Sequence, residues 1–555
     1  MASEWYNDVR RFTERLVRMN SVSPGAGEIV VAREILALLT EDGYGANYTA
    51  SGLDPIEGDR YERANVYAFV QGASPRTVVL LGHFDTVGTG DYGPLEPWAR
   101  QPGELWAHRE ALAAMTPGLA EDLAAHPDDW MLGRGTIDMK SGVAANIAII
   151  RHLAARNKQP LPLSVVFLAT PDEENESAGV LHAARFLLRL RAERGLDYLG
   201  AINTDYTAAR YTGDNHRYIY TGTVGKLLPS FLVIGRESHV GEPFSGVDAN
   251  LLAAEMISDL SMNPDLCDHV RGQSTPPPVT LHATDLKARY DVQLPFAAYF
   301  YLNVLTLDAT PDRLIETLRQ RATAALARTL AHIDTAERDW IAGQANTSWQ
   351  PRATPRTGDV LTWRELWAAS IERLGEDTVA AALDDAWMRL PEEIDSRERS
   401  MRLAHALWTV SGREGPAIVI YYSPPYYPHI AAAPCLLHEA VAQVAASHPD
   451  VHLSVEEFYP FISDMSYLQL DTTADLAALT ANMPVWRADG APARMGDYTL
   501  PLADIAALGL PVVNFGPYGA GAHQRGERLL MSYSFETLPQ LLLETIERLG
   551  ARTAG

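Results

Sequence analysis

Several stretches of the sequence end an apolar run or a glycine-bounded turn with a histidine or an acidic residue. The runs from Val78 to Val87 and from Leu163 to Glu174 have the nearly continuous apolar character of strands that are buried on both faces. In an open α/β sheet, the carboxyl ends of such strands meet at the edge where functional groups gather. The sequence therefore predicts a doubly wound α/β domain with its site at that edge.

The two runs deliver side chains that bind metals or protons. The first ends in His83 and, two residues on, Asp85, which points the same way on an extended strand and can hold the second ring nitrogen of His83. The second ends in Asp172, Glu173 and Glu174, three acids that repel one another unless a cation is near. One of these acids can bind a metal while its neighbour stays free as a base.

Three further segments add ligands of the same types. The turn from Gly133 to Gly142 places Asp138 before a predicted helix over 143–155, the run from 198 to 204 is followed by Asp205, and the segment from 512 to 523 ends in His523. A carboxylate has two oxygens, so Asp138 can bridge two cations. The whole set predicts two metal sites that share one bridging ligand.

Each residue alone has a plainer interpretation. A single histidine after a strand is more often structural, and consecutive acids are commonly a solvated loop or a helix N-terminus. Asp138 alone would be read as a turn or cap residue. The joint occurrence in one order favours the metal sites.

The same motifs resemble the M20 family of co-catalytic metallopeptidases and amidohydrolases, and most of all its long arginine-utilisation branch. The shared elements are the His-x-Asp strand, the Gly-Arg-Gly-x-x-Asp-Met-Lys turn, the Glu-Glu pair and the C-terminal histidine, in family order over nearly the whole chain.

The resemblance implies a role for each residue. It implies that His83 and Asp205 bind one metal, that Glu174 and His523 bind the other, and that Asp138 bridges them. Glu173 is then the general base, which takes a proton from a metal-activated water and delivers it to the leaving amine. The family also implies a cis peptide bond between Asp138 and Met139.

The order of predicted elements indicates an inserted domain. We expect a catalytic domain over 1–222 and 429–555 with a mixed, mostly parallel sheet, and between them, over 223–428, a ferredoxin-like α+β lid domain. Its predicted strands are 228–235, 288–293, 296–307 and 417–422, and its helices 249–260 and 311–333. A helical insertion covers about 334–415, with helices over 363–374 and 397–410, and a long loop over 88–132, with short helices over 109–114 and 118–125, is expected to wall the site.

Substrate contacts are less strongly specified. Ser238-His239-Val240-Gly241 resembles the family element whose histidine steadies the oxyanion, often across a homodimer formed through the lid domain. The Asp-x-Arg that usually ends the third lid strand is absent, and Asn303-Val304-Leu305 stands near its place. We expect Tyr206, Arg210 and Arg525 to face the substrate, whereas Asp464 is expected to be a helix cap.

Composition excludes several classes. The 555 residues carry a net charge of 46 − 70 = −24, which argues against nucleic-acid partners. No apolar run reaches membrane-spanning length, so we expect no membrane partner. The N-terminus does not resemble a signal peptide, and we therefore expect a cytoplasmic location. Cys267 and Cys435, the two cysteines, lack metal-type spacing, so ligation rests on histidine and carboxylate.

The predicted function is metal-dependent hydrolysis of an amide or peptide bond in a small substrate, a dipeptide or amino-acid conjugate, with a basic side chain as one option. Two divalent ions are expected, with zinc first and manganese or cobalt suited to the same ligands. The alternatives are an N-acyl amino acid deacylase of the same fold and a catalytically silent binding module. Phosphoester hydrolysis is disfavoured because no phosphate-binding glycine loop or basic cluster is evident.

Overall fold

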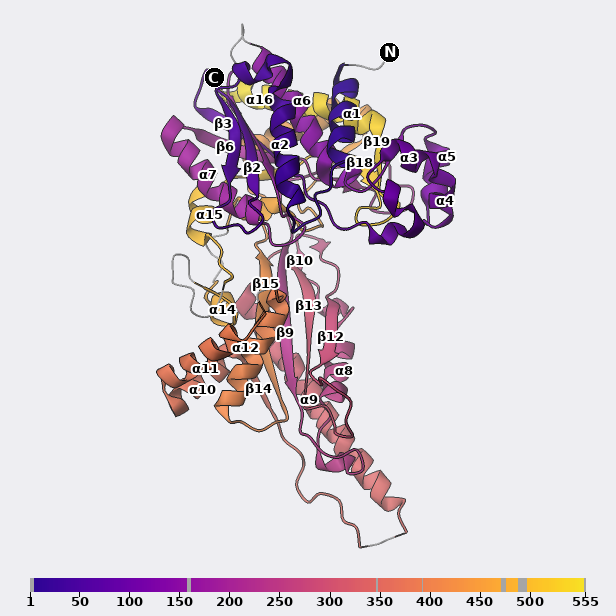
Figure 1. Cartoon of the computed structure of the whole chain (residues 1–555), viewed down its shortest axis with the longest axis vertical. Helices are drawn as coiled ribbons and strands as arrows, with labels where there is room; N and C mark the ends of the chain where they lie inside the picture. Colours follow the sequence, from indigo (N-terminus) through magenta and orange to yellow (C-terminus); the bar gives the residue numbers. More distant parts are fainter. Residues whose placement is uncertain are drawn as a thin grey trace. The chain divides into compact units, whose positions relative to one another are not determined.

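The chain forms two units, which the computed structural model describes over residues 4–156, 161–345, 348–391, 393–470, 476–487 and 497–553. The first unit contains Met1–Thr223, Ile430–Leu470 and Pro501–Gly555, and the second contains Val224–His429 and Asp471–Leu500. Figure 1 traces the chain through both. The described residues 476–487 and 497–500 thus group with the second unit, although they lie inside the range 429–555 that the sequence assigned to the first.

An eight-stranded mixed sheet organises the first unit, in the order β1-β2-β5-β3-β6-β17-β8-β16. Its four inner strands β5, β3, β6 and β17 run parallel, and β2 pairs antiparallel with β5 at one side while β8 pairs antiparallel with β17 at the other. The strands are β1 (Ala50–Pro55), β2 (Ala64–Val70), β3 (Arg76–His83), β5 (Ser164–Thr170), β6 (Asp197–Asn203), β8 (Arg217–Tyr220), β16 (Leu453–Glu456) and β17 (Val512–Asn514).

Helices cover both faces of this sheet, as the continuous apolar runs predict. Val165 and Phe167 share a core with residues of the helices α1, α2, α6, α13 and α16, whereas the alternate residue Val166 is equally buried outside that core, on the side of α7 and α15. The helices are α1 (Glu4–Val17), α2 (Gly27–Thr40), α6 (Ser141–Ala155), α7 (Ala178–Arg194), α13 (Leu436–Ser447), α15 (Leu502–Leu508) and α16 (Leu538–Thr553). The doubly wound prediction is confirmed.

A second, small sheet joins segments that are far apart in sequence. Its order is β4-β19-β18-β7, with β4 (Trp130–Leu132), β7 (Thr207–Ala208), β18 (Tyr518–Ala520) and β19 (Arg528–Leu530). Beside β4 lies the predicted long loop, which contains α3 (Pro102–Ala107), α4 (Arg109–Ala114) and α5 (Leu119–Ala125) around a small apolar core of its own. Its two predicted short helices are α4 and α5.

The second unit has a five-stranded sheet in the order β12-β13-β9-β15-β14. Numbered along the chain, the four antiparallel strands stand in the order 2-3-1-4 with α8 and α9 as crossovers, which is the predicted ferredoxin-like arrangement. The elements are β9 (Gly225–Ile234), α8 (Ala249–Leu260), β12 (Val279–Asp285), β13 (Ala297–Thr306), α9 (Pro311–Ala342), β14 (Asp359–Thr362) and β15 (Ala417–Tyr427).

One predicted strand of this sheet is wrong. The strand expected over 288–293 lies instead at β12, an edge strand whose residues are largely exposed and so give no apolar signal. Residues 286–293 form a loop, in which the carboxylates of Asp285 and Asp291 accept the backbone N–H groups of Lys287 and Gln293. These short Asp-centred turns compete with strand pairing.

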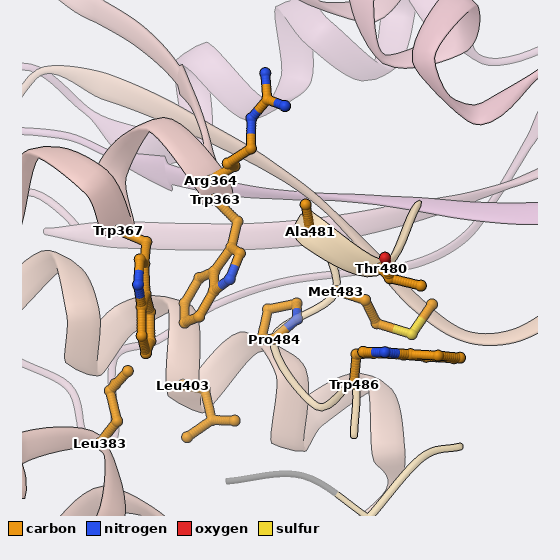
Figure 2. A pocket seen from close by; sticks show the side chains of 10 residues that line it. All are labelled: Trp363, Arg364, Trp367, Leu383, Leu403, Thr480, Ala481, Met483, Pro484 and Trp486. Atoms are coloured by element: carbon orange, nitrogen blue, oxygen red, sulfur yellow. The ribbon is translucent and has the colours of Figure 1, made fainter. Parts of the chain in front are cut away.

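The helical insertion is built from α10 (Trp363–Leu374), α11 (Glu376–Met388) and α12 (Ser396–Ser411). The first and last were predicted; α11 was not. Together with residues 480–486, these helices line a cavity of about 330 Å³ whose walls include Trp363, Trp367 and Trp486 (Figure 2). In the described part of the chain, no helix has both the length and the apolar character that crossing a membrane requires.

Candidate metal centre

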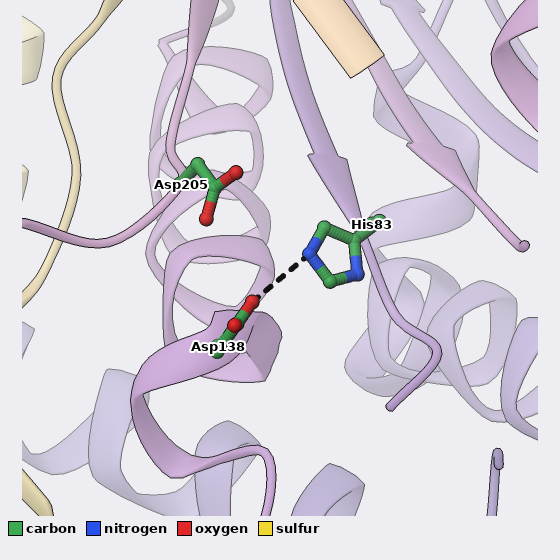
Figure 3. Close-up of side chains that lie close together, drawn as sticks. All are labelled: His83, Asp138 and Asp205. Carbon is green, nitrogen blue, oxygen red and sulfur yellow. Dashed lines mark hydrogen bonds and ion pairs between the residues drawn. The ribbon is translucent and has the colours of Figure 1, made fainter. Parts of the chain in front are cut away.

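Two groups of ligand atoms meet at the carboxyl edge of the large sheet. His83, Asp138 and Asp205 each offer one atom within 4.8 Å of the others, and Asp138, Glu174 and His523 do the same (Figure 3 shows the first group). The two oxygens of Asp138 face different histidines: Oδ1 lies 3.1 Å from His83 Nε2 and Oδ2 lies 3.1 Å from His523 Nε2. Asp138 therefore stands where a bridging ligand would stand.

Strand order explains why these residues meet. Neighbouring parallel strands β5, β3 and β6 end together, so His83, the acids after Thr170 and Asp205 share one edge. Close approach of the backbone does the rest, because a Cβ on Gly142 would lie only 2.1 Å from the carbonyl oxygen of Thr204. Glycine at this position lets the first turn of α6, and with it Asp138, reach Asp205.

Asp85 is fully buried, and it holds the acidic turn, the segment 172–174 that follows β5. Its Oδ1 accepts the backbone N–H of Glu173 at 3.1 Å and its Oδ2 that of Glu174 at 3.0 Å. The distance from Oδ1 to His83 Nδ1 is 3.4 Å, which is long for a hydrogen bond. The expected orientation of the His83 ring by Asp85 stays a prediction, and the structure gives Asp85 a second task that the sequence did not reveal.

A buried ion pair fixes the same turn from the other side. Asp172 has a left-handed backbone conformation (φ 72°), and its carboxylate pairs with Arg63 and accepts the hydroxyl of Ser23 and the backbone N–H of Ala178. A non-glycine residue in this conformation needs such support. The turn that presents Glu173 and Glu174 is therefore held by side chains of the protein itself.

Each carboxylate of the centre makes ionisation of its neighbours less favourable, because their negative charges repel one another. Burial, and then the charge of Asp138, raises the pKa of Asp205 to about 7, and burial raises the pKa of Glu174 with Asp138 adding to it. Burial would also raise the pKa of Asp138, but hydrogen bonds from His523 and His83 outweigh it and lower that pKa. A cation placed among these oxygens relieves the repulsion. The donor set of carboxylate oxygens and imidazole nitrogens fits two divalent ions of the zinc, manganese or cobalt type.

Glu173 belongs to neither ligand group. Its Oε2 lies 3.8 Å from His83 Nε2, and its side chain is 10% exposed. Burial raises its pKa well above the ordinary value for glutamate, and the charges of Glu174 and Asp464 raise it further, against the opposing effect of His83. A carboxyl group with a raised pKa can both take and return a proton near neutral pH.

The other predicted site residues are placed as follows. Tyr206 follows Asp205 and stacks on Phe461, with ring centroids 5.2 Å apart. Arg210 is half exposed and pairs with Glu456 at 3.2 Å. Arg525 lies two residues after His523 in the β18–β19 connection, and His239 belongs to the second unit, where its Nδ1 accepts the N–H of Gly241 at 3.0 Å.

Two residues near the centre were missed or misread. Asn514, on β17, accepts the N–H of Asp205 at 3.0 Å and donates to the Asp205 carbonyl at 2.9 Å, so it fixes the backbone of a candidate ligand. Asp464 was expected to cap a helix, but it is itself the first residue of the turn Asp464–Tyr467. It is buried, and its Oδ2 accepts the hydroxyl of Thr170 at 2.9 Å. The available signal for Asn514 was its place at the end of a buried strand, whereas Asp464 lies eight residues after β16 and has no such signal.

Comparison with known proteins agrees with this geometry. Residues 79–547 match the profile of peptidase family M20/M25/M40. Protein RocB of Bacillus subtilis (strain 168) is 31% identical over 549 residues, which cover 97% of this chain and 94% of RocB. Succinyl-diaminopimelate desuccinylase of Rhodopseudomonas palustris (strain TIE-1) is 28% identical over 335 residues, 60% of this chain and 75% of that protein.

A solved structure shares the fold at low sequence identity. Aminopeptidase PepT from Bacillus cereus ATCC 10987 matches with a TM-score of 0.53 and 14% identity, covering 98% of each chain. The resemblance expected from the motifs is thus confirmed. The chain belongs to the M20 family of metallopeptidases and amidohydrolases, and it is a hydrolase of peptide or amide bonds.

Proposed function

We propose that this protein hydrolyses the amide bond of a small amino-acid conjugate or dipeptide, with Glu173 as the general base and then the general acid. One observation carries the proposal: two ligand groups share Asp138, and Glu173 lies beside them without belonging to either. A carboxylate in that position is free to move a proton. Its neighbour Glu174 is engaged in the second group, 3.0 Å from His523.

The chain's own residues supply proton transfer and alignment. When bound, two divalent cations would activate a water molecule and polarise the scissile carbonyl. Glu173 accepts the proton of the attacking water as the carbon–oxygen bond forms, and it then donates that proton to the leaving nitrogen as the carbon–nitrogen bond breaks. Asp85 and Arg63 keep the acidic turn in place during both transfers. We assign His239 to the oxyanion, and dimerisation to the second unit, on the family resemblance alone.

The substrate class is supported from two directions. One relative is named for removing a succinyl group from a diamino acid, and one fold neighbour is named as an aminopeptidase. The first favours an N-acyl amino acid, and the second favours a peptide. The net charge of −24 gives a weak preference for a cationic substrate.

Substitutions at the neighbouring residues Glu173 and Glu174 distinguish the proposed general base from a proposed metal ligand. Glu173→Gln is expected to keep two bound ions while the rate falls by several orders of magnitude, whereas Glu174→Gln is expected to lose the ion at the Asp138, Glu174 and His523 group. Metal content is measured by elemental analysis. Turnover is measured on dipeptides, N-acyl amino acids and a phosphomonoester, with and without chelator. Full activity of Glu173→Gln would remove the proposed base.

A further inference from the structure

His523 lies in the connection between β18 and β19, whose own hydrogen bonds do not set the position of this histidine relative to Asp138. Its side chain is 52% exposed, and it lies between β18 and β19 in two successive tight turns. In these turns the N–H of Gln524 donates to the carbonyl of Gly521 at 2.9 Å, and the N–H of Glu527 donates to the carbonyl of Gln524 at 3.0 Å. These hydrogen bonds join residues within the connection only. The distance from His523 to Asp138 therefore has to be set by contacts between the connection and other segments.

Glu527 makes that contact, four residues after His523. It is fully buried, and its Oε1 accepts the backbone N–H groups of Ile137 at 3.2 Å and Asp138 at 3.4 Å. Its Oε2 accepts a hydrogen bond from Arg134 Nη1 at 2.8 Å. One carboxylate thus ties the segment that carries His523 to the turn that carries the bridging aspartate.

Arg134 extends the tie to a third segment. It is 2% exposed; its Nε donates to the carbonyl of Gly88 at 3.1 Å and its Nη2 to Asp91 Oδ1 at 3.0 Å. Gly88 lies shortly after the strand that delivers His83. The buried pair of Arg134 and Glu527 therefore joins the segments that carry His83, Asp138 and His523.

The long loop over 88–132 supports the same connection from outside. Arg528 pairs with Asp122 on α5, with 2.7 Å between Nε and Oδ2. A Cβ on Gly526 would lie 2.2 Å from Thr116 Cγ2, so the backbone rests directly on that loop. The connection is held on both sides, although the side chain of His523 itself is half exposed.

We propose that Arg134 and Glu527 are a positioning pair that sets the metal affinity of the Asp138, Glu174 and His523 group by fixing His523 relative to Asp138. Neither side chain belongs to a ligand group. Groups that orient ligands from behind typically change metal affinity 10- to 100-fold when removed. The inference rests on the proposed function only in requiring that this group hold a cation.

The test measures affinity at each group separately. In an Asp205→Ala background only the second group is complete, and in a His523→Ala background only the first is. Zn²⁺ competition against a chromophoric chelator then reads each group alone. Glu527→Gln is expected to lower the Zn²⁺ affinity of the second group about 10- to 100-fold. The first group should also lose some affinity, because Oε1 contacts the Asp138 backbone, but clearly less than the second group.

Two controls separate positioning from general stability. Arg151→Gln removes a buried arginine that donates to the carbonyl of Leu38 on the helix layer, and it is expected to lower the melting temperature without changing either affinity. The double variant Arg134→Gln/Glu527→Gln removes both buried charges, so it is expected to regain thermal stability relative to the single variants but not the affinity.

The outcomes are distinct. Unchanged affinity in Glu527→Gln, or equal losses at the two groups, would overturn the positioning pair while leaving the proposed hydrolase intact. A parent protein that binds Zn²⁺ at neither group would overturn both. Should Glu527→Gln not fold, Asp91→Asn is used in its place, because it removes a partly exposed partner of Arg134. This variant is expected to lower the Zn²⁺ affinity of the second group only. Unchanged affinity in Asp91→Asn would also overturn the proposal.

Discussion

Replacing Asp85 by asparagine tests how the acidic turn is held. The carboxylate of Asp85 accepts two backbone N–H groups, those of Glu173 and Glu174, at 3.1 and 3.0 Å in a fully buried position. Asparagine keeps one oxygen and turns its NH₂ group toward the other donor. The change removes a hydrogen bond to a charged acceptor, of about 1.5–3 kcal/mol, and leaves a buried donor unpaired.

The expected effect follows from that arithmetic. If about 3 kcal/mol falls on the turn alone, the ratio of aligned to displaced turn conformations falls roughly 100-fold, and turnover falls by the same factor once the displaced turn predominates. Asp85→Asn should therefore lower kcat/KM for amide hydrolysis about 100-fold. Affinity for Zn²⁺ should fall at the group that contains Glu174 and change little at the group of His83 and Asp205. The same single-group backgrounds, Asp205→Ala and His523→Ala, report the two affinities.

The opposite pattern would refute this reasoning. If Asp85→Asn weakens only the group that contains His83, Asp85 acts through the imidazole, as the sequence alone predicts, and the contacts to the turn are incidental. Asp129→Asn is a matched control, because Asp129 also accepts a backbone N–H, that of Ser532 at 2.9 Å, but in a different segment. It should leave both affinities and turnover unchanged.

Three further outcomes are expected. Removal of metal by chelation should lower the melting temperature, since an ion at 100 times its Kd adds about 2.7 kcal/mol; equal melting with and without saturating Zn²⁺ would contradict the metal centre. Gly142→Ala should destabilise the fold by about 3 kcal/mol in denaturant unfolding, because its Cβ would lie 2.1 Å from the Thr204 carbonyl oxygen; a neutral result would mean that this approach is not tight. Asp214 accepts hydrogen bonds from the backbone N–H groups of Arg210 and His216 and from the Tyr218 hydroxyl; although burial opposes them, they lower its pKa. Its stabilisation should therefore be complete above the ordinary aspartate pKa and disappear as the pH falls through the lowered value. The melting temperatures of wild type and Asp214→Asn should differ most at neutral pH and converge in acid; a pH-independent difference would contradict this.

Local pattern was enough to point to the residues of the two candidate ligand groups. His83, Glu173 and Glu174 could be predicted because each follows a run that is buried on both faces, and the order of parallel strands brings such ends together. The order of elements, together with the family resemblance, also indicated the ferredoxin-like domain, although one of its strands was placed wrongly. These features depend on residues close together in sequence.

What could not be predicted depends on distant contacts. Glu527 and Arg134 are 393 positions apart, and no local pattern announces their pairing. The role of Asp85 in the acidic turn likewise appears only once β3 and β5 lie side by side. The edge strand β12 escaped detection because its mostly exposed side chains give no apolar signal.

The position of β17 within the large sheet has a consequence for synthesis of the chain. β17 (Val512–Asn514) pairs with β6 (Asp197–Asn203) on one side and with β8 on the other. Until the ribosome has made residue 514, β6 has an unpaired inner edge, and at about 5–20 residues per second that interval lasts roughly 15–60 s. An open, apolar strand edge is a template for pairing with other chains. The nascent chain is therefore most prone to aggregate during that window, in which the second unit is synthesised while the centre still lacks its last histidine.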